Sequence, residues 1–181
     1  MTTTYDVRMA DLQEQHAAVV CGRLTMDRIG EFLGGAFSEV MQVVSAQGLR
    51  PAGAPFARYR FVEPVGDTAA TGGGGAEQTT GAAELDVEAG FPVSGAVTAT
   101  GRVEPSTLPG GHVATTLHVG SYAGVGSAYD AAQQFLTDEG YEVAGAPWES
   151  YLDEPGVAQP RTEVFVPCRR LRPRGSYPSD G

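Results

Sequence analysis

The chain contains no lysine: all 12 of its basic residues are arginine, against 22 aspartate and glutamate residues. The formal net charge is therefore −10. Binding along a nucleic-acid backbone needs a cationic surface, so we expect no direct nucleic-acid binding. An acidic chain favours solubility and attracts cationic partners over long range.

Cysteine is scarce as well, because Cys21 and Cys168 are the only two and no Cys-x-x-Cys pair occurs. Two cysteines do not make a zinc site, and we expect both to be small buried apolar residues. The three histidines, His16, His112 and His118, are too far apart in the pattern to form a metal site. We therefore expect no metal and no cofactor.

Phosphate-binding and catalytic motifs are also missing. The four glycines at 72–75 are not followed by the Lys-Ser or Lys-Thr pair and the helix that a phosphate-binding loop requires. No Gly-x-Ser-x-Gly elbow and no metalloprotease motif occurs. We interpret the Gly- and Thr-rich segment 66–81 as a long hairpin connection.

Long apolar runs are absent too, since none approaches the ~20 residues that a membrane-spanning helix needs. The N-terminus, MTTTYDVRMADLQEQ, lacks the charged-then-apolar order of a signal peptide. We expect a cytoplasmic protein without membrane contact. Its 181 residues, 41% of them hydrophobic, suffice for one well-buried domain.

What the chain does contain is a stretch that occurs twice. Residues 48–59 read GLRPAGAPFARY and residues 140–151 read GYEVAGAPWESY. The same offset pairs Phe37 with Tyr129. A period this long does not indicate a solenoid, so we infer one domain built from two similar halves.

A second match lies further along each half. VEAGFPV and TEVFVPC share a Glu-x-x-x-Pro pattern, which pairs Glu88 with Glu163 and Pro92 with Pro167. The repeat therefore covers more than the Ala-Gly-Ala-Pro turn.

Residue patterns predict where helices and strands lie. Gly48 and Gly140 stand just past the two expected helix ends. Helices are expected from about Thr25 to Ala46 and from about Val125 to Glu139, and strands at 5–9, 16–23, 56–62, 82–93, 97–105, 112–120, 148–152 and 162–167.

These elements predict an α+β fold in which two β-α-β-β modules form one curved antiparallel sheet. Both helices would cover one face, and the opposite face would be a concave cleft. We expect a single domain over 1–181, with module one at about 5–93, module two at about 97–168 and a tail at 169–181.

Strand alternation then predicts which side chains face the cleft. Leu85, Val87 and Ala89 should point to the helices and Glu88 away from them. By the same rule, Val164 and Val166 should face the helices, and Glu163 and Phe165 the cleft.

The short strand 148–152 allows two alternatives, Trp148/Ser150/Leu152 or Glu149/Tyr151 in the cleft. We favour the second set because it combines an acid with an aromatic ring, which leaves Trp148 toward the helices or the rim. By the repeat, Tyr59 and Phe61 occupy the corresponding face of the first half. Aromatic walls with a poorly solvated carboxylate suit lipophilic organic cations.

The ordered motifs DVEAGFPV (86–93), HVGSY (118–122), the helix with Ala128-Tyr129-Asp130, GAPWESYLDEPG (145–156) and TEVFVP (162–167) span most of the chain. With this set the chain resembles the GyrI-like family, the effector-binding domain of AraC- and MerR-type regulators. The resemblance implies two β-α-β-β modules related by pseudo-twofold symmetry and a ligand cleft with an acidic base.

The resemblance also implies positions for the site. The pocket glutamate of the family falls on Glu163, an aromatic residue on Tyr151, and a Gly-x-Tyr turn at the pocket entrance on Gly120 and Tyr122. Together with the strand analysis, the candidate ligand-binding residues are Glu163, Tyr151, Glu149, Phe165, Tyr59, Phe61, Tyr122 and Trp148.

Two functional classes follow. The first is a multidrug-binding protein that sequesters lipophilic, often cationic, aromatic molecules and so confers drug resistance. It would stand alone, since no helix-turn-helix precedes residue 5. By resemblance, the alternative is a hydrolase of reactive cyclopropane-containing natural products, with Glu163 and either Tyr151 or Glu149 in acid–base roles. Family analogy alone adds a DNA gyrase inhibitor-like protein.

Overall fold

The computed structural model describes residues 4–61, 84–154 and 156–172. The segment 66–81 lies outside the described residues, as does the tail beyond residue 172. The chain divides into two compact units. We call His16–Thr107 the first unit, and Met1–Gln15 together with Leu108–Gly181 the second unit.

The first unit places one helix on a small sheet with the strand order β3-β4-β2-β5. Strand β4 pairs antiparallel with both β2 and β3. The elements are β2 (Gln15–Thr25), the 3-10 turn η1 (Met26–Arg28), α1 (Ile29–Ala46), β3 (Phe56–Phe61), β4 (Glu84–Pro92) and β5 (Val103–Leu108).

The core of the first unit forms where α1 packs on β2 and β4. Val40 and Val44 of the helix and Ala18 and Ala89 of the strands are fully buried there. Ala89 therefore faces α1, as alternation in β4 predicts.

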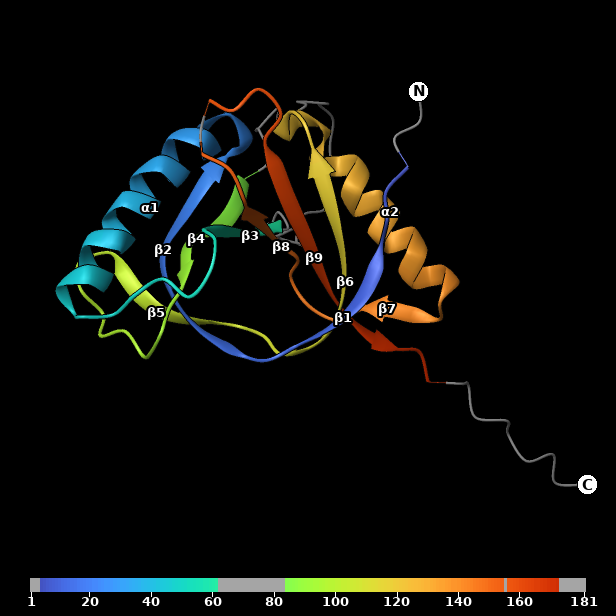
Figure 1. Ribbon diagram of the computed structural model, residues 1–181, viewed down its shortest axis with the longest axis horizontal. Helices are drawn as coiled ribbons and strands as arrows, with labels where there is room; N and C mark the ends of the chain where they lie inside the picture. The colour runs from blue at the N-terminus through green and yellow to red at the C-terminus, as the bar shows by residue number, and fades with distance from the viewer. Residues whose placement is uncertain (1–3, 62–83, 155, 173–181) are drawn as a thin grey trace, which may run out of the picture. The chain divides into compact units, whose positions relative to one another are not determined.

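The second unit repeats the plan with the strand order β1-β6-β9-β8, and β7 also pairs with β9. All of its strand pairings are antiparallel. The elements are β1 (Arg8–Leu12), β6 (Gly111–Val119), the 3-10 turn η2 (Tyr122–Gly124), α2 (Val125–Asp138), β7 (Tyr141–Val143), β8 (Trp148–Tyr151) and β9 (Arg161–Arg170). Figure 1 shows α2 running alongside β6 and β9.

The core of the second unit lies under α2. Val164 and Val166 of β9 pack against Ala128, Ala132 and Leu136 of the helix. The prediction that Val164 and Val166 face the helix is confirmed. Two helices and nine strands in the described residues confirm the α+β class.

The sequence repeat reappears in the backbone. Each helix ends before a glycine with positive φ, Gly48 at 71° and Gly140 at 77°, a conformation that only glycine adopts readily. The two Ala-Gly-Ala-Pro turns make matching hydrogen bonds, from Ala52 N to Pro92 O at 2.7 Å and from Ala144 N to Pro167 O at 2.8 Å. The duplicated residues thus hold the start of β3 in one unit and of β8 in the other.

Some expected boundaries are wrong. The strand expected at 97–105 is β5 at Val103–Leu108, because Thr100 and Val103 close a tight turn around Gly101, which has a φ of 60°. The strand expected at 5–9 begins later, at Arg8. Strand β7 was not expected, since only three residues pair with the end of β9.

Candidate functional site

The register of β8 against β9 decides which side chains share a face. Glu149 lies opposite Val164, and Tyr151 lies opposite Thr162. Directly opposed residues in an antiparallel pair project to the same side, and Val164 packs under α2. Glu149 and Tyr151 therefore lie on the helix side of the sheet, and the prediction that they face away from the helices is wrong.

Trp148 takes the opposite side. It lies across from Phe165, with which its ring stacks at 5.2 Å between centroids and 12° between planes. Ser150 lies across from Glu163 on that same side. The prediction that Trp148 points to the helices or the rim is therefore also wrong. Glu163 and Phe165 do lie on the side of the sheet away from α2, and the cleft expected there stays a prediction.

Glu149 is the centre of a buried polar cluster beneath α2. Its side chain has 8% exposure, and both carboxylate oxygens accept hydrogen bonds from phenols. Tyr129 of α2 donates to Oε1 at 2.9 Å, and Tyr151 donates to Oε2 at 2.8 Å. The residue is anchored from both the helix and its own strand.

The electrostatics of this carboxyl are unusual for a glutamate. Burial raises the pKa of Glu149 above its ordinary value. The hydrogen bonds from Tyr151 and Tyr129 and the nearby His118 act in the lowering direction but do not reverse the shift. None of the ion pairs between described residues involves Glu149. Its printed hydrogen-bond partners are two tyrosine hydroxyls, and His118 is the nearby group that acts on its charge.

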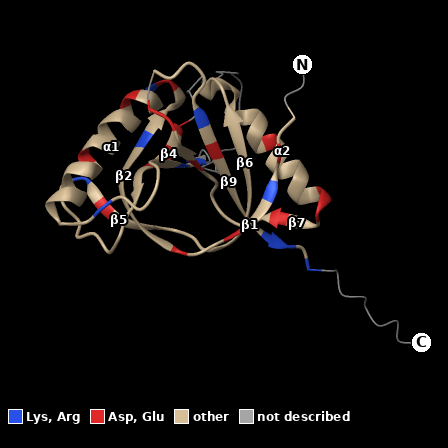
Figure 2. Ribbon diagram, in the orientation of Figure 1, with Lys and Arg blue, Asp and Glu red and all other residues tan. Residues whose placement is uncertain are grey.

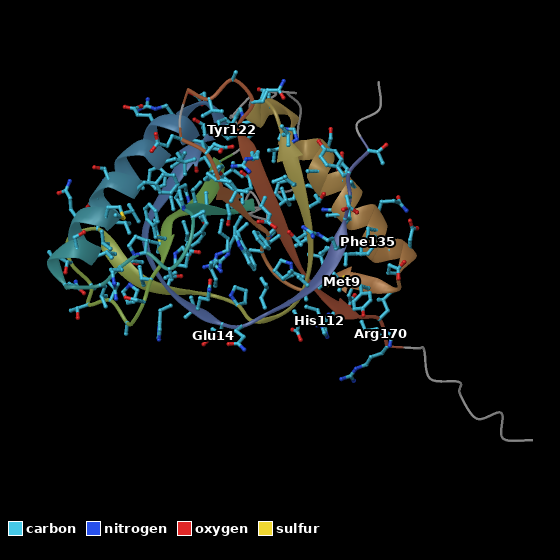
Figure 3. The ribbon with its side chains drawn as sticks, in the orientation of Figure 1. Met9, Glu14, His112, Tyr122, Phe135 and Arg170 are labelled. Atoms are coloured by element: carbon cyan, nitrogen blue, oxygen red, sulfur yellow. The ribbon has the colours of Figure 1, made fainter. Side chains whose placement is uncertain are left out.

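An aromatic path leads from this carboxyl to the surface. The ring of Tyr122 meets that of Tyr151 edge to face, with 5.8 Å between centroids. Tyr122, labelled in Figure 3, lies in η2 directly before α2. It is 51% exposed. The structure therefore brings together three of the predicted residues: Glu149, Tyr151 and Tyr122.

His118 supports the same region from β6. It is buried, its Nε2 lies 2.9 Å from the carbonyl oxygen of Ser121, and its Nδ1 lies 2.9 Å from the hydroxyl of Tyr5. Because a carbonyl only accepts, Nε2 carries a proton, and in the neutral ring Nδ1 accepts from Tyr5. The hydrogen bond from His118 Nε2 to Ser121 O fixes the turn that carries Tyr122.

Thr162 adds an unusual polar atom. Its Cα is paired with Tyr151 on one side and His118 on the other. Its Oγ1 is sealed from solvent and has no hydrogen-bond partner among the described residues. A buried hydroxyl without a partner is unfavourable by about 1–3 kcal/mol, so a polar group brought to this face would be stabilised there.

The remaining predicted residues lie elsewhere. Glu163 accepts a hydrogen bond from Thr115 Oγ1 at 3.2 Å on the side opposite to Glu149, so the two predicted acids do not meet. Tyr59 lies across from Val87 in the first unit, on the side of Ala89 and hence of α1, not away from it as predicted. The side chain of Phe61 lies outside the described residues.

Tyr129, His118 and Thr162 lie in this cluster but are not among the site residues predicted from the sequence. One signal was available: the repeat pairs Phe37 with Tyr129 and Ala57 with Glu149. The half that gains the acid also gains the hydroxyl that binds it. His118 and Thr162 begin the HVGSY and TEVFVP motifs, which carry the family resemblance but assign neither residue to the site.

No group of His, Cys, Asp and Glu in the described part of the chain is arranged to hold a metal ion. None of the helices within the described ranges is long and apolar enough to cross a membrane. The cluster around Glu149 consists of one carboxylate, phenols and an imidazole.

A comparison with protein families matches residues 5–169 to the GyrI-like small molecule binding domain. The chain belongs to this family. A search among curated proteins finds no match to this GyrI-like domain.

Solved structures share the fold at low identity. The EcmrR–DNA complex superimposes on this GyrI-like domain with a TM-score of 0.72 at 20% identity, over 92% of this chain and 58% of that chain. The present chain thus spans less than two thirds of that protein. The crystal structure of the EcmrR C-terminal domain gives a TM-score of 0.64 at 18% identity, covering 93% of this chain and 100% of that one.

A third neighbour is a hydrolase from Listeria innocua, with a TM-score of 0.57 and 15% identity over 90% of this chain and 91% of that one. At these identities the likeness shows the fold alone.

Proposed function

We propose that this GyrI-like domain binds lipophilic, cationic aromatic molecules at the Glu149 cluster. The observation that carries the proposal is a buried carboxylate held by two tyrosine hydroxyls and in no ion pair with a described residue. Burial of a carboxylate is unfavourable unless a positive charge accompanies it. A cationic ligand supplies that charge. Its binding is therefore favoured, because it removes the free-energy penalty of burying the Glu149 carboxylate without a positive charge.

The surroundings favour an aromatic ligand. Tyr122 and Tyr151 offer ring surface between solvent and the carboxylate. Such faces attract organic cations by about 0.5–2 kcal/mol per contact, without demanding one hydrogen-bond geometry. Few directional contacts mean that cations of different shapes bind, and sequestration of such molecules is the multidrug-binding role that we propose.

Access requires movement of side chains. Glu149 has 8% exposure, so a ligand contacts the carboxylate only after the tyrosines above it turn aside. Tyr122, already half exposed, is the first ring that an entering molecule meets. Its replacement by alanine should weaken binding through lost ring surface while leaving the charge requirement intact.

A titration with two dyes tests the proposal. We expect rhodamine 6G, a lipophilic cation, to bind the native protein, and Glu149→Gln to lose about 10- to 150-fold in affinity, as expected for about 1.5–3 kcal/mol of charge-assisted contact. Nile red, a neutral lipophilic dye, should bind both proteins alike. Glu163→Gln is the matched control, because Glu163 lies on the other side of the sheet.

Equal rhodamine affinity for the native protein and for Glu149→Gln would contradict the proposal. Loss of binding in Glu163→Gln alone would move the site to the opposite side of the sheet. Circular dichroism of each variant establishes that the fold is retained.

A second candidate is hydrolysis of an electrophilic small molecule such as a cyclopropane-containing compound. It is favoured by the raised pKa of Glu149 and the hydroxyl of Tyr151 at 2.8 Å, because a raised pKa favours the protonated carboxyl that a general acid requires. Mass spectrometry distinguishes the candidates. A product that gains one water with the native protein but not with Glu149→Gln supports hydrolysis, whereas unchanged ligand in a stoichiometric complex rejects it.

A further inference from the structure

Thr162 lies beside the Glu149 cluster, on the same side of the sheet. It stands two positions before Val164 in β9, and Val164 packs under α2. Alternation along the strand therefore points the side chain of Thr162 toward α2 as well. Glu149 lies opposite Val164 in the pairing of β8 with β9, and Tyr151 lies opposite Thr162. Glu149 is thus a diagonal neighbour of Thr162, a spacing that long side chains bridge.

The hydrogen-bond donors of the Glu149 cluster are already in use. Tyr129 and Tyr151 each have one hydroxyl hydrogen, and both hydrogens are donated to the carboxylate. His118 donates its Nε2 hydrogen to the carbonyl oxygen of Ser121. An ionised carboxylate accepts about four hydrogen bonds, so the two phenols do not saturate Glu149. A ligand that meets this carboxylate has to bring donors of its own.

The hydroxyl of Thr162 adds to this demand for donors. Thr162 is fully buried, and its Oγ1 has no hydrogen-bond partner among the described residues. A buried oxygen without a donor is unfavourable, and the negative charge of Glu149 attracts positively charged groups to the same place. An N–H group that carries positive charge satisfies both the oxygen of Thr162 and the charge of Glu149.

The two strands that flank Thr162 contribute one formal charge. Figure 2 shows β6 in tan, because this strand contains no Lys, Arg, Asp or Glu. Glu149 is the one such residue of β8. Arg161 and Glu163 adjoin Thr162 along β9 and so project to the other side of the sheet. Arg161 is moreover paired with Asp153 at 2.8 Å. The charge that β6 and β8 present to a ligand beside Thr162 is therefore negative.

We propose that the Glu149 cluster selects cations whose charge lies on a primary or secondary amine, and that Thr162 makes this selection. The inference rests on the proposed function, because it names the class of cation bound at the same site. The protonated amine donates one N–H to Glu149 and another to Thr162 Oγ1. A quaternary ammonium has no N–H and leaves Oγ1 buried without a donor. The head group of the ligand is thus selected, while its aromatic body is held by ring surface alone.

Two naphthalene ligands test the selection on the full chain. The first, 2-(1-naphthyl)ethylamine, is a primary ammonium at neutral pH. The second is its N,N,N-trimethyl derivative, which carries the same charge on the same ring without an N–H. In calorimetric titrations we expect the native protein to bind the amine about tenfold more tightly, or better.

Variants of Thr162 assign the preference to its hydroxyl. Thr162→Val removes the hydroxyl and keeps the shape of the side chain, so it should weaken amine binding about tenfold and leave the trimethyl ligand unaffected. Thr162→Ser keeps the hydroxyl and should retain the preference. Thr115→Val is the matched control, because Thr115 is a buried threonine on the other side of the same sheet, where it donates to Glu163.

Thermal unfolding separates this role from a structural one. Since Oγ1 of Thr162 is buried with no partner among the described residues, Thr162→Val should raise the Tm of the ligand-free protein by about 2–4 °C. A threonine that only supports the fold would instead lower the Tm when its hydroxyl is removed. The expected result is therefore a more stable protein that binds the amine less tightly.

The outcomes distinguish this inference from the proposed function. Equal affinity of the native protein for both ligands, an equal loss for both in Thr162→Val, loss of the preference in Thr162→Ser, or a lower Tm of Thr162→Val would each overturn the role of Thr162. The proposed function survives these results if both ligands bind less tightly to Glu149→Gln. Absence of binding, or binding that Glu149→Gln leaves unchanged, would overturn both.

Discussion

Replacement of Tyr129 by phenylalanine isolates one contact of the buried carboxylate. The repeat shows that this helical position accepts the change, since its counterpart in the first unit is Phe37. The variant keeps the ring packed on the core of the second unit and removes the hydroxyl that donates to Glu149 Oε1 at 2.9 Å. The experiment therefore measures what that hydrogen bond contributes to the free energy of unfolding.

The contribution of this hydrogen bond to the free energy of unfolding depends on the charge of Glu149. A hydrogen bond to a charged group contributes about 1.5–3 kcal/mol, and a bond between neutral groups about 0.5–1.5 kcal/mol. The hydroxyl lowers the pKa of Glu149 by favouring the charged form, so the variant raises the folded-state pKa further. A group with a raised folded pKa loses stability as pH increases through that pKa. The loss caused by Tyr129→Phe should thus be smallest at about pH 4 and largest above the folded pKa of Glu149.

Urea denaturation followed by tryptophan fluorescence is the assay. Trp148 is the sole tryptophan and has 2% exposure, so its emission reports unfolding of the second unit. In a Glu149→Gln background the same Tyr129→Phe change should cost about 1 kcal/mol less at neutral pH, because only the neutral bond is removed. The loss in free energy of unfolding should differ between about pH 4 and a pH above the folded pKa of Glu149, and between the native and Glu149→Gln backgrounds. Equal losses in either comparison would refute the argument that the hydroxyl stabilises a buried charge.

The other predictions concern the surface and the backbone. Hydrogen bonds from Arg161 lower the pKa of Asp153 to about 2. This pair should therefore stabilise the protein above pH 3.8 and cease to do so as the pH falls toward about 2. In an acid titration of stability, Asp153→Asn should lack the loss of stability between these two pH values. Gly90→Ala should abolish folding, because the new Cβ would lie 1.8 Å from the backbone oxygen of Ala18, and soluble expression measures this. Gly35→Ala in α1 meets no atom within 4 Å and should raise stability by about 1 kcal/mol, seen as a higher Tm.

Much of the scaffold was predictable because its determinants are local. Both helices end before Gly48 and Gly140, where glycine permits a positive φ that other residues resist. The Glu-x-x-x-Pro match paired Pro92 with Pro167, and both prolines accept equivalent hydrogen bonds from the Ala-Gly-Ala-Pro turns. Duplicated sequence produced duplicated backbone geometry, since each turn carries its own conformational preferences.

The candidate site was predictable only in part. Glu149 and Tyr151 were chosen together, and the structure does join them, at 2.8 Å. Their side of the sheet was predicted wrongly, because β8 has only four residues and both of its alternating sets contain an aromatic and a polar residue. Alternation states that Glu149 and Trp148 face opposite ways, but not which of them faces α2.

The sequence by itself determined the family, the two-module repeat, the helix ends and the residue types of an acidic aromatic site. Only the tertiary structure decided that Glu149, rather than Glu163, is the carboxylate enclosed by tyrosines under α2. The physical reason is that strand register and helix packing act between residues distant along the chain. Burial and hydrogen-bond partners, which set the chemistry of a carboxyl, follow from that packing rather than from the neighbours of Glu149 in sequence.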